Sequence, residues 1–297
     1  MAITKIGNST VERLVDWTGP LIQTEEFFPT ATWDEIEAQR SWMEPHFLAP
    51  KAQCEVGALD LSLHSYIIKT GKHTILIDTC MGNDKKRSLI PVWADYNSNY
   101  MEKMAGMGVN PEDIDFVMCT HLHVDHVGWN TKLVNGKWVP TFPNARYIFH
   151  KKEYEAWADR ENLGADNPAD DGSWDDSVVP IIEAGKADLV TSDFAIGDNI
   201  WLEPSYGHTP GHVCVNLKEG GDHALFTGDS FHHPVQVAHP EWSTAFCLDP
   251  VESANTRKRI VDKIADTSTL MMAAHFMDPT IGRIVGNGDR CKLDVNI

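Results

Sequence analysis

The sequence has no excess of basic residues. Lys and Arg number 25 against 43 Asp and Glu in 297 residues, which gives a formal net charge of −18 at pH 7. Nucleic acids and anionic membranes bind basic protein faces, so this balance argues against both as partners. The 42% hydrophobic and 23% charged fractions are those of an ordinary globular protein, long enough to bury a substantial core.

Closely spaced cysteine pairs and long apolar runs are also missing. No C-x-x-C pair occurs, and the cysteines lie far apart, at Cys54, Cys80, Cys119, Cys214, Cys247 and Cys291. Buried free thiols in a reducing compartment are therefore expected rather than a disulfide framework. Residues 1–16 lack an apolar core of signal-peptide length, and no run approaches membrane-spanning length. We expect a cytoplasmic location.

What the sequence does have is a dense group of metal-binding residue types. His121, His123, Asp125 and His126 form the pattern H-x-H-x-D-H directly after the apolar run 116–119. This run is too short for a helix and reads as a buried strand that ends in a loop. Imidazole nitrogens and carboxylate oxygens suit Zn²⁺. In an extended loop, the first three side chains would share one side and His126 would turn to the other, so the loop could serve two neighbouring metals.

The remaining pattern is typical of an α/β protein. Alternation over 59–68, a turn at 70–72 and an apolar run over 73–78 predict a β-hairpin. Further strands are expected at 146–149, 200–202, 213–217, 224–227 and 269–274. Helices are expected at 95–107, at 151–158, after a cap at Thr32 or Asp34, and from Asp249 to about 265 with Val251, Ala254, Val261 and Ile264 on one face. No linker marks a boundary, so we expect one domain over 1–297, with an N-terminal extension, about 1–56, packed on it.

An acidic stretch interrupts the pattern at residues 159–176. Gly and Pro are scattered through it. We expect a solvated surface insertion, with a lid over the site as the alternative.

Polar residues also follow three later strands. Gly207-His208-Thr209-Pro210-Gly211-His212 follows 200–202, Gly228-Asp229 follows 224–227, and His275 follows 269–274. Functional groups collect beyond the carboxyl ends of strands in α/β sheets, so these residues could converge with the histidine cluster.

The chain resembles the metallo-β-lactamase-fold hydrolase superfamily in four features. These are H-x-H-x-D-H, G-H-T-P-G-H, T-G-D and a late strand ending in His. The resemblance covers about 59–276 and includes the strand followed by Asp78. It implies an α/β fold, an αββα sandwich of two mixed sheets flanked by helices. It also implies two metal ions, expected to be Zn²⁺ although other divalent metals would suit. The first would be held by His121, His123 and His208 and the second by Asp125, His126 and His275, with Asp229 bridging them. His212 would be an outer partner.

The resemblance implies a hydrolase in which a metal-bridging hydroxide attacks and Asp125 moves a proton. His123 argues against the di-iron redox branch, which carries a carboxylate at that position. The sequence looks most similar to lactonase-like and organophosphate- or aryl-ester-hydrolase-like members. We therefore expect cleavage of a small neutral ester or lactone. The alternatives are a glutathione thioester or β-lactam hydrolase of this fold, or a di-iron oxidoreductase.

The expected partner is a small-molecule substrate, and the oligomeric state stays open, a homodimer included. The residues expected around the site are aromatic, sulfur-containing or imidazole: Trp129, Phe231, His232, His233, Phe276 and Met277. Trp42 and Trp93 are expected in the ordinary core.

Overall fold

The computed structural model describes residues 3–50, 57–89, 91–159, 163 and 169–297. The chain divides into two compact units. Unit 1 comprises residues 1–17 and 63–194, and unit 2 comprises residues 18–62 and 195–297.

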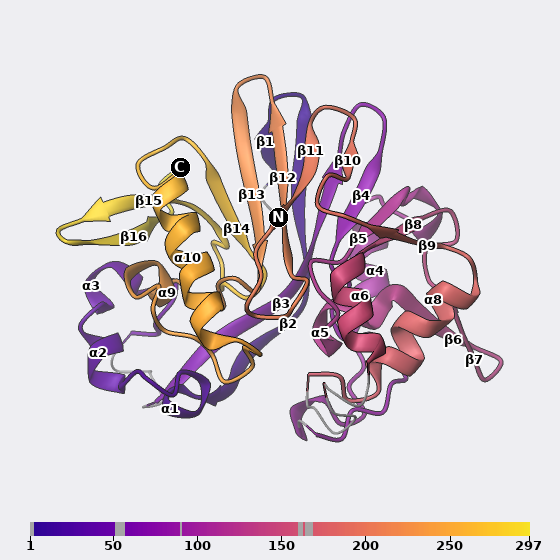
Figure 1. Cartoon of the computed structure of the whole chain (residues 1–297), viewed down its shortest axis with the longest axis horizontal. Coiled ribbons are helices and arrows are strands. Elements are labelled where there is room, and N and C mark those ends of the chain that lie inside the picture. Colours follow the sequence, from indigo (N-terminus) through magenta and orange to yellow (C-terminus); the bar gives the residue numbers. More distant parts are fainter. Residues whose placement is uncertain (1–2, 51–56, 90, 160–162, 164–168) are drawn as a thin grey trace. The chain divides into compact units, whose positions relative to one another are not determined.

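A seven-stranded mixed sheet organises unit 1, and its strands β2 and β3 continue into unit 2 (Figure 1). In sheet order its strands are β1 (Thr4–Ile6), β2 (Ser9–Gln23), β3 (Ala58–Lys69), β4 (Thr74–Ile77), β5 (Phe116–Met118), β8 (Arg146–His150) and β9 (Ala187–Val190). Strands β3 and β4 form the predicted hairpin. Strands β4, β5, β8 and β9 run parallel, so their carboxyl ends share one edge. Strands β1 and β2 were not predicted.

Over its described residues, unit 1 also contains helices and a small hairpin. They are α4 (Tyr100–Gly106), α5 (Val124–Val127), α6 (Lys151–Ala158), the π-helix η4 (Trp174–Val178), α8 (Val179–Glu183), the 3-10 turns η1 (Pro91–Trp93), η2 (Pro111–Asp113) and η3 (Gly128–Asn130), and the hairpin β6 (Thr131–Val134) and β7 (Lys137–Pro140). The prediction of α6 is confirmed. Helix α4 starts later than predicted because Asn83 holds Ser98 in a loop through side-chain hydrogen bonds to its backbone.

Only part of the acidic stretch 159–176 lies within the described residues. Asp170 and Asp171 are buried, which contradicts a solvated insertion there. Hydrogen bonds compensate their burial: the Asp171 carboxylate accepts from the Leu89 backbone N–H, and that of Asp170 from the Trp174 backbone N–H. A lid over the site stays a prediction.

Unit 2 contains a second mixed sheet. In order its strands are β10 (Ala195–Ile196), β11 (Ile200–Pro204), β12 (Val213–Glu219), β13 (Asp222–Gly228), β14 (Leu270–Ala273), β15 (Ile281–Asn287) and β16 (Arg290–Asp294). Strands β11 to β14 match the predicted ones. Strands β13 and β14 are parallel neighbours, so the residues that follow them emerge side by side.

The helices of unit 2 are α1 (Thr24–Phe27), α2 (Trp33–Glu37), α3 (Arg40–Met43), α9 (Val235–Ala238) and α10 (Pro250–Ile264). Thr32 caps α2 through a capping box, as predicted. Asp249 caps α10 by accepting a hydrogen bond from the backbone of Glu252, also as predicted. The predicted buried face of α10 is wrong at Val251, which is 70% exposed. Ala254, Val261 and Ile264 are buried beside polar residues such as Arg257.

Residues 24–47 pack within unit 2 against residues 232–245. The backbone N–H of Ala245 donates to the carbonyl of Phe27 at 2.9 Å. His233 donates from Nε2 to the carbonyl of Phe47 at 3.0 Å. These contacts hold residues 24–47 within unit 2, while the single domain with an N-terminal extension packed on it stays a prediction.

The described residues include most of the cysteines that were expected to be buried free thiols. Cys80, Cys119 and Cys214 are buried free thiols, whereas Cys247 and Cys291 are partly exposed and Cys54 lies outside the described residues. Among the described helices, none is long and apolar enough to cross a membrane.

Candidate metal centre

The H-x-H-x-D-H loop in unit 1 is held at the carboxyl ends of parallel strands. Asp78 follows β4 and Thr120 follows the neighbouring strand β5. The Asp78 carboxylate accepts hydrogen bonds from the Thr120 backbone N–H at 2.8 Å and the Thr120 hydroxyl at 2.9 Å. It also accepts one from Nδ1 of His126 at 2.9 Å. This buried carboxylate therefore fixes both ends of the loop, in the position that the sequence assigned to it.

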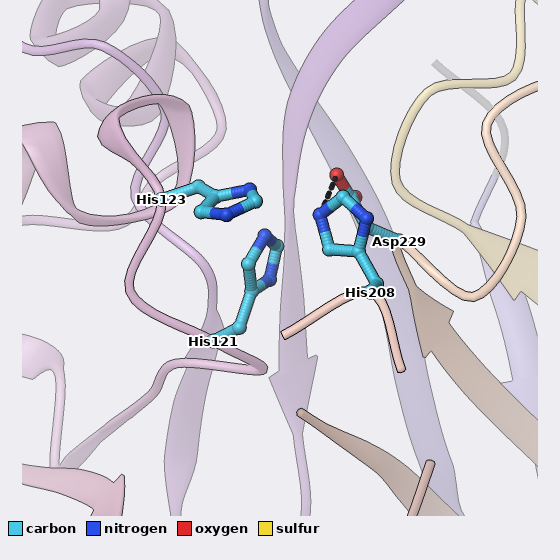
Figure 2. A group of neighbouring side chains, drawn as sticks. All are labelled: His121, His123, His208 and Asp229. Carbon is cyan, nitrogen blue, oxygen red and sulfur yellow. Dashed lines mark ion pairs between the residues drawn. The ribbon is translucent and has the colours of Figure 1, made fainter. Parts of the chain in front are cut away.

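The structure brings the side chains of this loop together. The His121 ring centroid lies 4.5 Å from that of His123 and 4.0 Å from that of His126, and all three residues are buried. Figure 2 shows His121 and His123 with their rings close together. One expectation is wrong in detail: the loop is not extended throughout, because α5 begins at Val124. This helical turn places Asp125 next to His126, with 3.6 Å between Asp125 Oδ2 and His126 Nε2.

The tautomer of His126 follows from its contacts. Because Nδ1 donates its hydrogen to Asp78, a neutral ring carries a lone pair on Nε2. That lone pair lies near the carboxylate of Asp125. Two acceptors facing one another are repulsive unless a cation is nearby, and metal-binding histidines typically donate their other ring N–H to a carboxylate in this way.

In unit 2 the parallel strands β13 and β14 place Asp229 beside His275. His275 Nε2 lies 2.9 Å from Asp229 Oδ1. His208, in the loop between β11 and β12, brings its Nε2 to 3.3 Å from Asp229 Oδ2, the contact dashed in Figure 2. Gly207 permits this loop: its φ is +120°, and an added Cβ would lie 2.1 Å from the backbone nitrogen of Ser253.

His275 repeats the arrangement of His126. Its Nδ1 donates to the carbonyl of Ser62 at 3.2 Å, so a neutral ring turns the lone pair of Nε2 toward Asp229. A carboxylate oxygen and an imidazole lone pair 2.9 Å apart require a shared cation, either a proton or a metal ion. The donor set of unit 2 therefore fits a divalent cation on the same grounds as that of unit 1.

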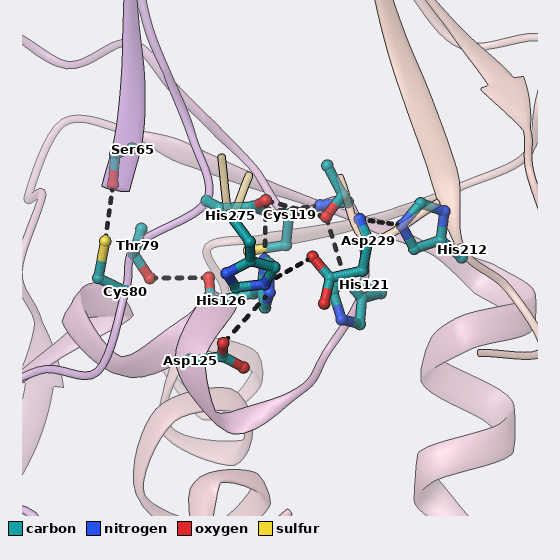
Figure 3. Close-up of polar contacts among 12 residues, drawn as sticks. Ser65, Thr79, Cys80, Cys119, His121, Asp125, His126, His212, Asp229 and His275 are labelled. Atoms are coloured by element: carbon teal, nitrogen blue, oxygen red, sulfur yellow. Dashed lines mark hydrogen bonds and ion pairs between the residues drawn. The ribbon is translucent and has the colours of Figure 1, made fainter. Parts of the chain in front are cut away.

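His212 holds the backbone of Asp229 (Figure 3). The Asp229 backbone N–H donates to His212 Nε2 at 3.0 Å, so this nitrogen is an acceptor. Nδ1 must then carry the hydrogen, which it donates to the Ser205 hydroxyl at 2.7 Å. Both ring nitrogens are therefore engaged, and the geometry agrees with the expected role of an outer partner.

His232 and His233 differ in their surroundings. The His232 ring stacks on that of His275, with centroids 5.5 Å apart, and its Nε2 lies 3.2 Å from Asp229 Oδ2. Among the described residues its Nδ1 has no hydrogen-bond partner. Burial lowers the pKa of His232 to about 3 despite the nearby Asp229, so the ring is neutral. His233 points away, toward the carbonyl of Phe47.

Cys247 was missed by the sequence reasoning as a contact of the site. Its Sγ lies 3.5 Å from His208 Nδ1 and donates a hydrogen bond to the Ser253 hydroxyl oxygen at 3.4 Å. Burial alone would raise the pKa of Cys247, but the His208 contact and the charge of Arg257 outweigh it and lower the pKa to about 6. Burial alone would likewise lower the pKa of His208, but Asp229 and Cys247 raise it to about 9. A lone cysteine on a loop carries no sequence signal that could have revealed this contact.

Several residues expected around the site instead belong to the core. Trp129 stacks on Tyr100, with ring centroids 5.5 Å apart, inside the hydrophobic core of unit 1. Phe276 is fully buried and contacts Phe47, within unit 2. Trp93 is buried, as expected for the core.

Comparison with known proteins finds relatives of this chain. An N-acyl homoserine lactonase from Bacillus thuringiensis is 21% identical over 239 residues, which cover 74% of this chain and 83% of the relative. AidC, a dizinc quorum-quenching lactonase, superposes with a TM-score of 0.77 at 19% identity, covering 99% of this chain and 96% of that one. The hydrolase AbOPH superposes with a TM-score of 0.81 at 22% identity, covering 99% and 97%.

These likenesses confirm the expected fold, two mixed sheets with helices, and the expectation of a metal-dependent hydrolase. The family model described as the metallo-β-lactamase superfamily matches residues 60–275. Since this match spans most of the chain and contains all four motifs, the chain belongs to the metallo-β-lactamase superfamily.

Proposed function

We propose that this chain is a two-zinc hydrolase that cleaves a small, neutral ester or lactone. The observation that carries the proposal is the repeated arrangement at His126 and His275. Each ring donates from Nδ1 to an outer acceptor and turns Nε2 toward a carboxylate. Each unit thus contributes histidine and aspartate donors in the orientation that metal binding needs.

The proposed ligands follow the family pattern position by position. One metal would be held by His121, His123 and His208, the other by Asp125, His126 and His275, and Asp229 would be shared. The donors are imidazole nitrogens and carboxylate oxygens, which suit Zn²⁺. Bound there, the metal pair would lower the pKa of water and polarise the bond to be cleaved.

The chain's own residues would position these groups and move protons. Asp78 and the Ser62 carbonyl hold His126 and His275 with Nε2 as the free donor atom. His212 holds the backbone of Asp229. Asp125 is partly exposed and is the proposed proton carrier during turnover.

The contacts of the buried basic side chains support a neutral substrate. Among the described residues, the buried basic side chains are Lys85, Arg87 and Arg257. Lys85 and Arg87 pair with Asp176. Arg257 donates to the Ser230 and Pro240 carbonyls and to two serine hydroxyls. These cations are thus engaged internally, and none is reserved for a substrate carboxylate.

The lactone is favoured over the ester by the relatives, several of which are named N-acyl homoserine lactonases. The test is kcat/KM of the zinc-loaded protein for N-acyl homoserine lactones, other neutral lactones, aryl esters, glutathione thioesters and β-lactams under one set of conditions. We expect the neutral lactones to rank first, with aryl esters and phosphotriesters as side activities. A clear preference for glutathione thioesters or β-lactams would refute the proposed substrate, and iron with visible absorbance would favour the di-iron alternative.

A further inference from the structure

A buried carboxylate lies behind the histidine loop of unit 1. Glu153 on α6 is only 1% exposed. Its helix neighbours Lys152 and Glu155 are exposed, whereas Trp157, one turn further on, is buried. Glu153 and Trp157 therefore form the inward face of α6. A carboxylate in such a place is costly unless hydrogen bonds compensate the loss of water.

One oxygen of Glu153 receives two hydrogen bonds that compensate for its burial. Oε1 accepts from Trp157 Nε1 at 2.7 Å and from the backbone N–H of Leu122 at 3.1 Å. Leu122 stands between His121 and His123. The Trp157 ring in turn meets the His123 ring edge to face, with centroids 5.5 Å apart and an angle of 82°. Glu153 thus holds the backbone between two histidines and also the ring that packs against one of them.

The contact completes a regular pattern of anchors. Backbone groups of alternate loop residues form hydrogen bonds with the rest of unit 1. The N–H groups of Thr120, Leu122 and Val124 donate to Asp78, Glu153 and the Ala169 carbonyl, and the His126 carbonyl accepts from Thr79. Together these four anchors leave His121, His123 and Asp125 as the intervening residues. Of these partners, only Glu153 is a side chain supplied by a helix.

We propose that Glu153 is a positioning residue that presets His121 and His123 for metal binding. The inference rests on the proposed function, because it takes these histidines as ligands. The charged acceptor makes both hydrogen bonds stronger than neutral ones. Without it, the Leu122 N–H would be buried and unpaired, and the loop between the two ligands would relax.

The test uses three variants. Glu153→Leu removes the acceptor at similar volume, Glu153→Gln keeps a neutral acceptor, and Glu155→Gln is the matched control on the exposed face of α6. Zinc affinity is measured by competition with a chromophoric chelator. The thermal midpoint is measured with and without zinc, since ligand binding to the native state raises the midpoint in proportion to affinity.

We expect Glu153→Leu to weaken zinc binding at least about 10-fold, at the lower end of the losses for supporting residues of metal sites. The zinc-induced rise of the midpoint should shrink with it. Glu153→Gln should stay within about 5-fold of wild type, since a neutral acceptor keeps part of the bond. Glu155→Gln should match wild type.

The proposal would be overturned if the Glu153→Leu protein is less stable but keeps full zinc affinity and the full zinc-induced rise. A purely structural role lowers the thermal midpoints with and without zinc equally. If Glu153→Leu does not fold, Trp157→Phe removes the Nε1–H donor and keeps a ring against His123. Zinc affinity should then fall in the Glu153→Gln/Trp157→Phe double variant, and unchanged affinity in that double variant would overturn the proposal. A wild-type chain that binds no zinc would instead refute the proposed function.

Discussion

Replacing Asp229 with alanine is expected to abolish hydrolysis and to deplete the protein of metal. The Asp229 carboxylate lies within 3.3 Å of the Nε2 atoms of His208, His232 and His275. Its removal leaves these buried imidazoles without their common anion and deprives both proposed metals of a ligand. Loss of metal activation removes several kcal/mol of transition-state stabilisation, or roughly a 10³-fold or larger fall in kcat/KM.

The measurement is kcat/KM together with elemental analysis of the purified Asp229→Ala protein. Asp222→Ala, at the exposed start of the same strand β13, is the matched control and should keep both metal content and rate. An Asp229→Ala protein that retains two metals and a rate within about 10-fold of wild type would contradict the bridging role.

Replacing Asp176 with alanine is expected to cause a large loss in the free energy of unfolding. The side chains of Lys85 and Arg87 are each only 1% exposed. Asp176 Oδ1 lies 3.1 Å from Lys85 Nζ, and Oδ2 lies 2.7 Å from an Arg87 nitrogen. Removing the carboxylate leaves two buried positive charges unpaired, which typically costs about 3–5 kcal/mol. Urea unfolding of the variant measures this loss in the free energy of unfolding.

The control for this variant is Asp175→Ala, because Asp175 is the exposed neighbour in η4. It should change the free energy of unfolding by no more than about 0.5 kcal/mol. Equal losses in both variants, or less than about 1 kcal/mol for Asp176→Ala, would show that the buried pair is not what holds residues 169–178.

The same pair predicts a dependence of stability on pH. Burial alone would raise the pKa of Asp176, but hydrogen bonds from Arg87 and the charge of Lys85 outweigh it and hold the pKa below its ordinary value of 3.8. A carboxyl with a depressed folded-state pKa contributes stability that is present above its unfolded pKa and is lost as the pH falls through the folded value. Wild type should therefore lose stability below about pH 4 through this group, and Asp176→Ala should lack that component.

The sequence pointed to the candidate site residues but not to the residues that hold them in place. The histidine loop and the residues after β13 and β14 could be assigned because strand ends gather polar side chains at one edge of a sheet. Strand β2 was missed because polar residues occupy inward positions: Ser9 and Asp16 are buried along with Val11 and Leu14, which hides the alternation of apolar residues. Asp16 compensates its burial through Tyr96, a partner far along the chain that local patterns do not reveal.

The supporting residues share this difficulty. Glu153 and Arg257 are charged residues on buried faces of helices, where the hydrophobic period predicts apolar side chains, and Asp176 is a partly buried one. Each is stabilised by partners distant in sequence, such as Leu122 for Glu153 and Lys85 for Asp176. Cys247 beside His208 belongs to the same group. Local composition predicts that such residues are exposed or have no particular role, and only the folded chain brings their partners together.

The proposed binuclear centre is tested most directly by the metal content of the wild-type protein. We expect elemental analysis of protein purified without chelator, and supplied with Zn²⁺, to approach two zinc ions per chain, with hydrolytic activity rising as the second is bound. A chain that holds a single metal at full activity, with no gain from added Zn²⁺, would contradict the account.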